Sequence, residues 1–200
     1  MATMPCVEVD DLVVRGDGAK ALHAIREPEA ALALWARELP EALADTIGRI
    51  GLGTVDDLAL TIDLPIPASA LAASLVAGGY EGDAARLLAA DILALARQHA
   101  VISGTSRLAI RLEVVETDAC RRFHADYVRY RLLTTYRGAA TQWIRADTPD
   151  CIEQMRTGEV AVFKGRLLLP EPPILHRSPP LEESGGEPRL LLVIDPADAA

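Results

Sequence analysis

Cysteine is scarce in this chain: the 200 residues include only Cys6, Cys120 and Cys151, and no two of them form a CxxC motif. Three widely separated thiols predict reduced cysteines in a reducing compartment and argue against a disulfide framework. The sequence also lacks an apolar run near the roughly 18 residues that a membrane span needs. Its first residues show no basic segment followed by an apolar one, the pattern of a secretory signal. We therefore expect a cytoplasmic protein with no membrane partner.

Basic residues are also fewer than acidic residues. Lys and Arg number 20 against 29 Asp and Glu, so the formal net charge is −9. Nucleic acids and anionic lipids both require a basic protein surface, and we therefore expect no nucleic-acid partner. The composition is otherwise ordinary for a folded globular protein, with 50% hydrophobic and 24% charged residues.

The composition changes near the middle of the chain. Residues 1–100 contain 23 Ala and 16 Leu, whereas residues 101–200 contain 10 and 12. Ala and Leu favour helices, and their spacing in the first half is helical. We expect a helical N-terminal part over residues 1–104 that includes one or two strands. The expected helices are 29–38, 40–50, 67–78 and 83–104, and the expected strands are 54–62 and a segment around His23.

The second half contains short apolar runs separated by Gly and Pro, which is typical of a sandwich or barrel such as a jelly roll. Thr148 and Pro149 resemble a helix N-cap and a first-turn proline, and they predict one short helix over 148–155. The predicted fold class is α+β, with the helical part packed on a cupin-like β-barrel over residues 105–200 in one continuous domain. The expected strands are 107–115, 127–136, a segment around Trp143, 159–163, 166–169, 174–177 and 189–194.

Candidate metal ligands lie in the β-rich half. His124 and Asp126 form an H-x-D motif, and on a strand two side chains at this spacing share a face. His176 follows 52 residues later in another expected strand. Two imidazoles and one carboxylate leave three coordination positions open, and they form the facial set that holds non-haem Fe(II). Arg189 begins an apolar strand 13 residues after His176, and its guanidinium can pair bidentately with a carboxylate such as that of 2-oxoglutarate.

Neighbouring residues have two interpretations each. Tyrosine hydroxyls commonly bind a co-substrate carboxylate, so Tyr127 is a candidate for that role, although strand tyrosines are also packing residues. Arg131 of the same segment is a further candidate for binding the co-substrate. Cys120 would complete a closed zinc site with the three candidate ligands, whereas a small thiol at a turn is the simpler interpretation. His124 and Arg189 also have plain structural interpretations, as a hydrogen-bonded strand histidine and a surface cation.

The order of these motifs resembles the double-stranded β-helix of the Fe(II)/2-oxoglutarate dioxygenases, particularly the prolyl-hydroxylase-like group. The resemblance implies metal ligation by His124, Asp126 and His176 and binding of 2-oxoglutarate by Arg189. The chain has a longer hairpin between the distal histidine and the arginine than those enzymes. A closer resemblance, over most of the chain, is to the bacterial domain-of-unknown-function family 1826. The segments that carry it are 120–126 (CRRFHAD), 131–136 (RLLTTY) and 176–180 (HRSPP).

Three functions fit these residues. The first is an Fe(II)- and 2-oxoglutarate-dependent oxygenase whose substrate is unknown. The second is a non-catalytic, cupin-like protein that handles zinc or iron, and the third is an interaction module that uses the acidic helical face. The sequence also predicts that Arg189 faces the barrel interior. A buried charge needs a partner, so we expect a ligand there or, in the empty protein, a protein carboxylate such as Asp126 or Glu159.

Overall fold

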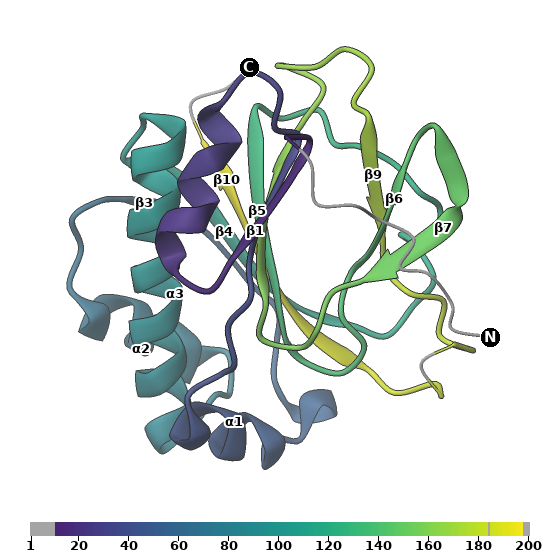
Figure 1. The fold of residues 1–200 in the computed structure, drawn as a ribbon. Coiled ribbons are helices and arrows are strands. Elements are labelled where there is room, and N and C mark those ends of the chain that lie inside the picture. Colours follow the sequence, from purple (N-terminus) through teal and green to yellow (C-terminus); the bar gives the residue numbers. More distant parts are fainter. Residues whose placement is uncertain (1–10, 184, 198–200) are drawn as a thin grey trace.

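Two β-sheets organise the chain in the computed structural model, which describes residues 11–183 and 185–197 (Figure 1). Cys6 and the segment inspected for a secretory signal lie outside the described residues. The large sheet is formed by β1 (Val13–Gly16), β2 (Leu32–Trp35), β3 (Leu58–Asp63), β4 (Arg107–Val115), β5 (Tyr130–Arg137), β8 (Val160–Lys164) and β10 (Arg189–Pro196). Its strands lie in the order β1-β2-β8-β5-β10-β4-β3. The small sheet has the order β7 (Thr148–Gln154), β6 (Gln142–Arg145) and β9 (Ile174–Arg177).

The helices and the small sheet lie on opposite sides of the large sheet (Figure 1). The helical elements are α1 (Glu41–Gly48), α2 (Ala68–Ala77), α3 (Gly82–Ser103) and the 3₁₀ segments η1 (Ala19–Arg26) and η2 (Leu52–Thr54). Along α3, Leu88, Ile92 and Leu95 are buried at helical spacing, as the sequence predicts. Gly104 then ends the helix in a left-handed conformation. Within the described residues, no helix is both long and hydrophobic enough to cross a membrane.

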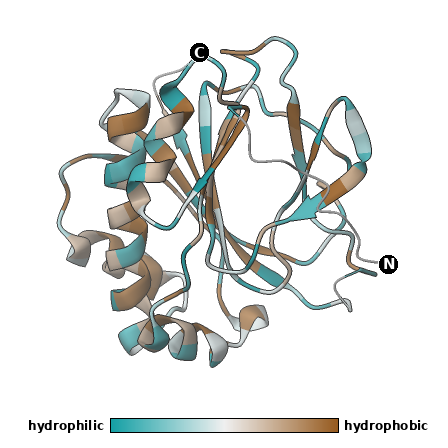
Figure 2. Ribbon diagram, in the orientation of Figure 1, coloured by the Kyte–Doolittle hydropathy of each residue, from teal (hydrophilic) through white to brown (hydrophobic). Residues whose placement is uncertain are grey.

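The large sheet is buried on both faces. Strand β10 lies between β5 and β4, and its side chains alternate between two hydrophobic cores. Leu190 and Leu192 pack with the core that the helices cover. Leu191 and Val193 instead pack with Trp143 of the small sheet. Figure 2 shows the hydrophobic residues concentrated in these central strands, with mixed character along α3. The molecule is therefore a mixed α+β protein in which two sheets enclose the second core.

Four predicted elements are wrong. Residues 29–38 contain strand β2 rather than a helix, and His23 lies in the 3₁₀ segment η1 rather than in a strand. Residues 148–155 form strand β7 rather than a short helix, and 166–169 form a turn instead of a strand. The N-terminal part also supplies three strands to the large sheet, β1, β2 and β3, where one or two are predicted.

The physical reasons differ between these segments. Residues Ala31 to Leu34 are buried on both faces, and a short run that is apolar at every position does not distinguish a strand from a buried helix. Pro149 lies in the edge strand β7, where its missing N–H breaks no essential ladder bond. In the turn at 166–169, the backbone N–H groups of Leu168 and Leu169 both donate to the carbonyl of Gly165.

Candidate metal centre

The backbone brings the two candidate histidines together. His124 forms an isolated antiparallel bridge with His176 of β9, and each residue donates its N–H to the carbonyl of the other, at 3.0 and 2.9 Å. Directly paired residues in such a bridge project their side chains to the same side. The two imidazole centroids are accordingly 4.9 Å apart, and Asp126 follows two residues after His124.

The three side chains converge, as the sequence predicts. His176 Nε2 lies 3.0 Å from Asp126 Oδ2, and His124 Nε2 lies 3.8 Å from Asp126 Oδ1. One ligand atom from each residue lies within 4.8 Å of the other two. Two adjacent ligands of an octahedral ion with bonds near 2.1 Å are about 3 Å apart. The His176–Asp126 pair already has this separation, and the His124–Asp126 pair is 0.8 Å wider.

Hydrogen bonding leaves the ligand atoms available. Oδ2 of Asp126 is buried and, among the described residues, has no hydrogen-bond partner, because the nearby His176 ring lacks the required geometry. His124 Nδ1 lies 2.8 Å from the carbonyl of Arg122. A carbonyl only accepts, so Nδ1 carries the proton and Nε2 of the neutral ring has a free lone pair. Metal-binding histidines are commonly oriented by this kind of bond, and the donor set therefore fits a divalent ion.

The electrostatics keep the ligands in their metal-binding forms. Burial alone would raise the pKa of Asp126, but adjacent His176, Arg131 and His124 hold it well below its usual range. Burial lowers the pKa of His176, and the opposing effect of Asp126 is smaller. Near neutral pH, Asp126 is thus a carboxylate and His176 a neutral imidazole, the states that bind metals.

Arg131 links Asp126 to a second carboxylate. Its Nη1 forms an ion pair with Oδ1 of Asp126. Its Nε and Nη2 donate to the two oxygens of Asp195, at 2.8 and 2.6 Å. These contacts outweigh burial and raise the pKa of Arg131, so its charge is permanent. Oδ1 of Asp126 is therefore committed to Arg131, and Oδ2 remains directed toward His176.

A cavity of about 290 Å³ opens beside the ligands and contains Arg189 on its wall. Only 5% of Arg189 is exposed. Its Nη1 donates to the carbonyl of Ala139 at 3.1 Å, and Nη2 makes a long contact of 3.5 Å with Thr141 Oγ1. Its Nε is buried without a partner among the described residues. Burial lowers the pKa of Arg189 to about 10, although Cys120 and Glu113 oppose the effect.

Gly138 allows the close approach that positions Arg189. Its φ is +84°, and a Cβ added there would lie 2.9 Å from both Cα and Cβ of Arg189. Only glycine combines this backbone conformation with that contact. The turn can therefore bring the carbonyl of Ala139 to the guanidinium.

Comparison with known proteins shows which family the chain belongs to. The sequence profile of a family described as "Protein of unknown function (DUF1826)" matches residues 16–195. The chain belongs to this family. The profile covers every strand of both sheets except the first three residues of β1 and the last residue of β10, and it includes His124, Asp126, His176 and Arg189. No curated protein matches the sequence.

One solved dioxygenase structure shares the fold of this chain, and two others score slightly lower. A rice dioxygenase for auxin oxidation has a TM-score of 0.50 and 12% identity, over 93% of this chain and 83% of that chain. The dioxygenase for auxin oxidation 1 from Arabidopsis thaliana, solved with 2-oxoglutarate, has a TM-score of 0.49 and 13% identity, over 94% of this chain and 93% of that chain. A prolyl-4-hydroxylase from Pseudomonas putida has a TM-score of 0.46 and 16% identity, over 88% of this chain and 96% of that chain. At these identities the rice comparison shows a common fold and no more.

The structure departs from several expected contacts. Arg189 faces the cavity together with Leu191 and Val193, but the expectation that Asp126 or Glu159 pairs with it is wrong. Asp126 pairs with Arg131, while buried Glu159 pairs with Arg15 and Arg156. Because these carboxylates have other arginine partners, Arg189 has no ion-pair partner among the described residues.

The other candidates lie in different surroundings. Tyr127 is 78% exposed and does not line the cavity with the ligands. Cys120 lines the cavity but is not part of the three-ligand cluster, so the geometry does not assemble the closed zinc site. Arg131 lines the cavity too, although its guanidinium is occupied by two carboxylates.

Sequence reasoning missed Asp195 and Thr141. Asp195 lies on β10 at the same parity as Arg189, so the alternation that places Arg189 inward also places Asp195 inward. That signal was present in the sequence. Thr141 follows the Gly138 turn, and its approach to Arg189 depends on a contact between distant segments that no local pattern reveals.

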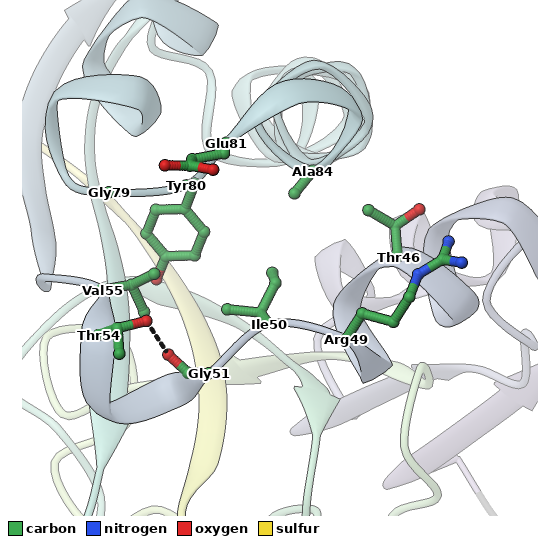
Figure 3. A pocket seen from close by; sticks show the side chains of 10 residues that line it. All are labelled: Thr46, Arg49, Ile50, Gly51, Thr54, Val55, Gly79, Tyr80, Glu81 and Ala84. Atoms are coloured by element: carbon green, nitrogen blue, oxygen red, sulfur yellow. Dashed lines mark hydrogen bonds between the residues drawn. The ribbon is translucent and has the colours of Figure 1, made fainter.

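A larger cavity of about 470 Å³ lies among α1, η2 and the start of α3 (Figure 3). Figure 3 shows Arg49 extending away from its centre and the Tyr80 ring forming one wall beside Val55. Its lining contains no histidine or cysteine and a single carboxylate, that of Glu81. These side chains form no cluster of metal-binding groups, so the smaller cavity beside His124, Asp126 and His176 is the stronger functional candidate.

Proposed function

We propose that this protein is a non-haem Fe(II)- and 2-oxoglutarate-dependent oxygenase. The observation that carries the proposal is the coexistence, in one cavity, of the His124–Asp126–His176 cluster and a buried arginine without a carboxylate partner. The cluster offers three ligands to a metal, and Arg189 offers a charge to an anion. The fold shared with the rice dioxygenase supports the same function.

Fe(II) bound in this set would supply the redox chemistry that activates O₂. The overall reaction consumes O₂, 2-oxoglutarate and a substrate C–H bond. It releases CO₂, places one oxygen atom in succinate and the other in the hydroxylated substrate, and so balances atoms and electrons. The protein's contribution is to bind, orient and exclude water from the reactants.

Each residue has a defined part in this proposal. His124, Asp126 and His176 hold the ion and leave three positions open. Arg189 pairs with the carboxylate of 2-oxoglutarate that is remote from its oxo group, and this contact orients the co-substrate toward the metal. Leu191 and Val193 form an apolar wall of the cavity, which lowers the local dielectric and strengthens that ion pair.

Anaerobic titration of 2-oxoglutarate into Fe(II)-loaded protein, followed by its visible charge-transfer absorption, tests the binding step. Arg189→Met should weaken 2-oxoglutarate binding by about 100-fold, since two charge-assisted hydrogen bonds are lost. Arg177→Met is a matched control, because Arg177 lines the same cavity but is bound to Gln142 and Glu183. The control should change binding much less.

Succinate formation under O₂ then tests catalysis. Wild-type protein should form succinate, and His176→Ala should not. Metal-loaded wild-type protein that binds no 2-oxoglutarate would contradict the proposal and favour a metal-handling function. Wild-type protein that binds neither Fe(II) nor Zn(II) would contradict both and leave the interaction module.

A further inference from the structure

We propose that Asp195 is a positioning residue of the metal site, acting on Asp126 only through Arg131. The inference rests on the proposed metal site and goes beyond its three ligands. Asp195 does not touch the metal ligands. Its role is to fix Arg131, which in turn fixes the side-chain rotation of Asp126 and leaves one of its oxygens free for a metal.

The strand register places the pair. Leu132 of β5 lies opposite Ile194 of β10, so the next residues outward are Arg131 and Asp195. Both have the parity that faces the cavity. Asp195 accepts two hydrogen bonds from Arg131 in the side-by-side geometry that a guanidinium and a carboxylate favour. The pair is mostly buried, with side-chain exposures of 15% and 12%.

This anchorage restricts Asp126. Arg131 has Nε and Nη2 committed to Asp195, so its Nη1 has one accessible direction, toward Oδ1 of Asp126. Oδ1 is thereby committed to Arg131, while it also lies 3.8 Å from His124 Nε2, and Oδ2 lies 3.0 Å from His176 Nε2. Asp126 would therefore offer Oδ2 to a metal, because Oδ1 is already paired with Arg131.

The charge balance explains why a second carboxylate is needed. Arg131 alone would place a positive charge next to a divalent cation and weaken its binding. Asp195 neutralises that charge while keeping the guanidinium in place. Removal of the Asp195 charge should therefore weaken metal binding in two ways. The positive charge of Arg131 is no longer neutralised, and its guanidinium is no longer held in one orientation.

Co(II) titration of the full-length protein tests the inference, with affinity from competition against a chelator and coordination from the visible spectrum. Asp195→Asn should weaken Co(II) binding by about tenfold, the lower end of the range for residues that orient metal ligands. It should also change the intensity of the Co(II) bands, because Asp126 is no longer held to one oxygen. In an Arg131→Gln background, Asp195→Asn should have almost no further effect.

Asp91→Asn is the matched control. Asp91 forms the comparable buried pair with Arg37, at 2.7 and 3.0 Å, on the helical side of the large sheet. It should lower stability toward urea without changing Co(II) affinity or spectrum. If Asp195→Asn does not fold, Arg131→Lys tests the inference instead. One ammonium group cannot hold two carboxylates in this geometry, so Arg131→Lys should also weaken Co(II) binding.

Equal Co(II) affinity and spectra for wild type and Asp195→Asn would overturn this inference alone. An undiminished effect in the Arg131→Gln background would also overturn it, because Asp195 would then act independently of Arg131. Wild-type protein that binds no Co(II) would overturn the metal site itself.

Discussion

Replacement of Arg189 by methionine should stabilise the ligand-free protein. Burial lowers the pKa of Arg189 to about 10 from 12.5. At about 1.4 kcal/mol per pKa unit, the charged side chain disfavours the folded state by about 3 kcal/mol. Methionine keeps the length and apolar contacts of the side chain but carries no charge. It leaves the carbonyl of Ala139 without its donor, which costs about 1–3 kcal/mol, so the expected net gain is about 1 kcal/mol.

Urea denaturation of metal-free protein, followed by the fluorescence of Trp35 and Trp143, measures this change. Arg131→Met is the control, because it removes an arginine that has carboxylate partners and should destabilise by about 3–5 kcal/mol. With metal and 2-oxoglutarate bound, wild type should become more stable than Arg189→Met. Metal and 2-oxoglutarate at 100 times the dissociation constant should stabilise wild type by about 2.7 kcal/mol, and Arg189→Met much less. A loss of stability for ligand-free Arg189→Met comparable to that of Arg131→Met would refute the reasoning.

Two further predictions concern buried groups away from Arg189. Burial lowers the pKa of His99 to about 4, so the unfolded chain alone binds this proton between pH 6.5 and 4. Stability should therefore fall by about 2 kcal/mol from pH 7 to pH 5 in urea titrations, and His99→Leu should lack that part of the decrease; an unchanged pH dependence would show that His99 is protonated when folded. A Cβ added to Gly165 would lie 2.2 Å from the carbonyl oxygen of Val128 and 2.8 Å from that of Asp126. Gly165→Ala should thus displace Asp126 and weaken Co(II) binding by about tenfold or more, whereas Gly53→Ala, which meets no atom within 4 Å, should not; equal affinities would mean that the loop absorbs the shift.

Local patterns predicted the parts of the fold that local physics determines. The helical spacing along α3 and the end of the helix at Gly104 are both properties of a short segment, and both are confirmed. Strand β2 could not be predicted in the same way. It is apolar on both faces because it lies between β1 and β8, and that position is set by residues more than 100 positions away in the chain.

In the site, too, local sequence predicted some features, and contacts between distant residues determine the others. The H-x-D motif and the distal histidine predicted the cluster of three candidate ligands from residue type, and the bridge between His124 and His176 brings the two histidines together. The partner of each arginine was not predictable from local spacing. Asp126 and Glu159 were both chemically suitable for Arg189, but Asp126 pairs with Arg131, and Glu159 pairs with Arg15 and Arg156.

The distribution of arginine partners argues for the charge of the missing ligand. Three other arginines line the cavity, and each has a carboxylate partner: Arg111 with Glu113, Arg131 with Asp195 and Arg177 with Glu183. Arg189 is more deeply buried and has a hydrogen bond to one neutral carbonyl instead. An unpaired buried charge persists where function requires it, because a neutral side chain would be more stable there. Under the proposed function, Arg189 would pair with one carboxylate, and a metal held by the three-residue cluster would have three open positions. A dicarboxylate with a chelating oxo acid at one end would pair with Arg189 and fill two of these positions, which leaves the third for O₂.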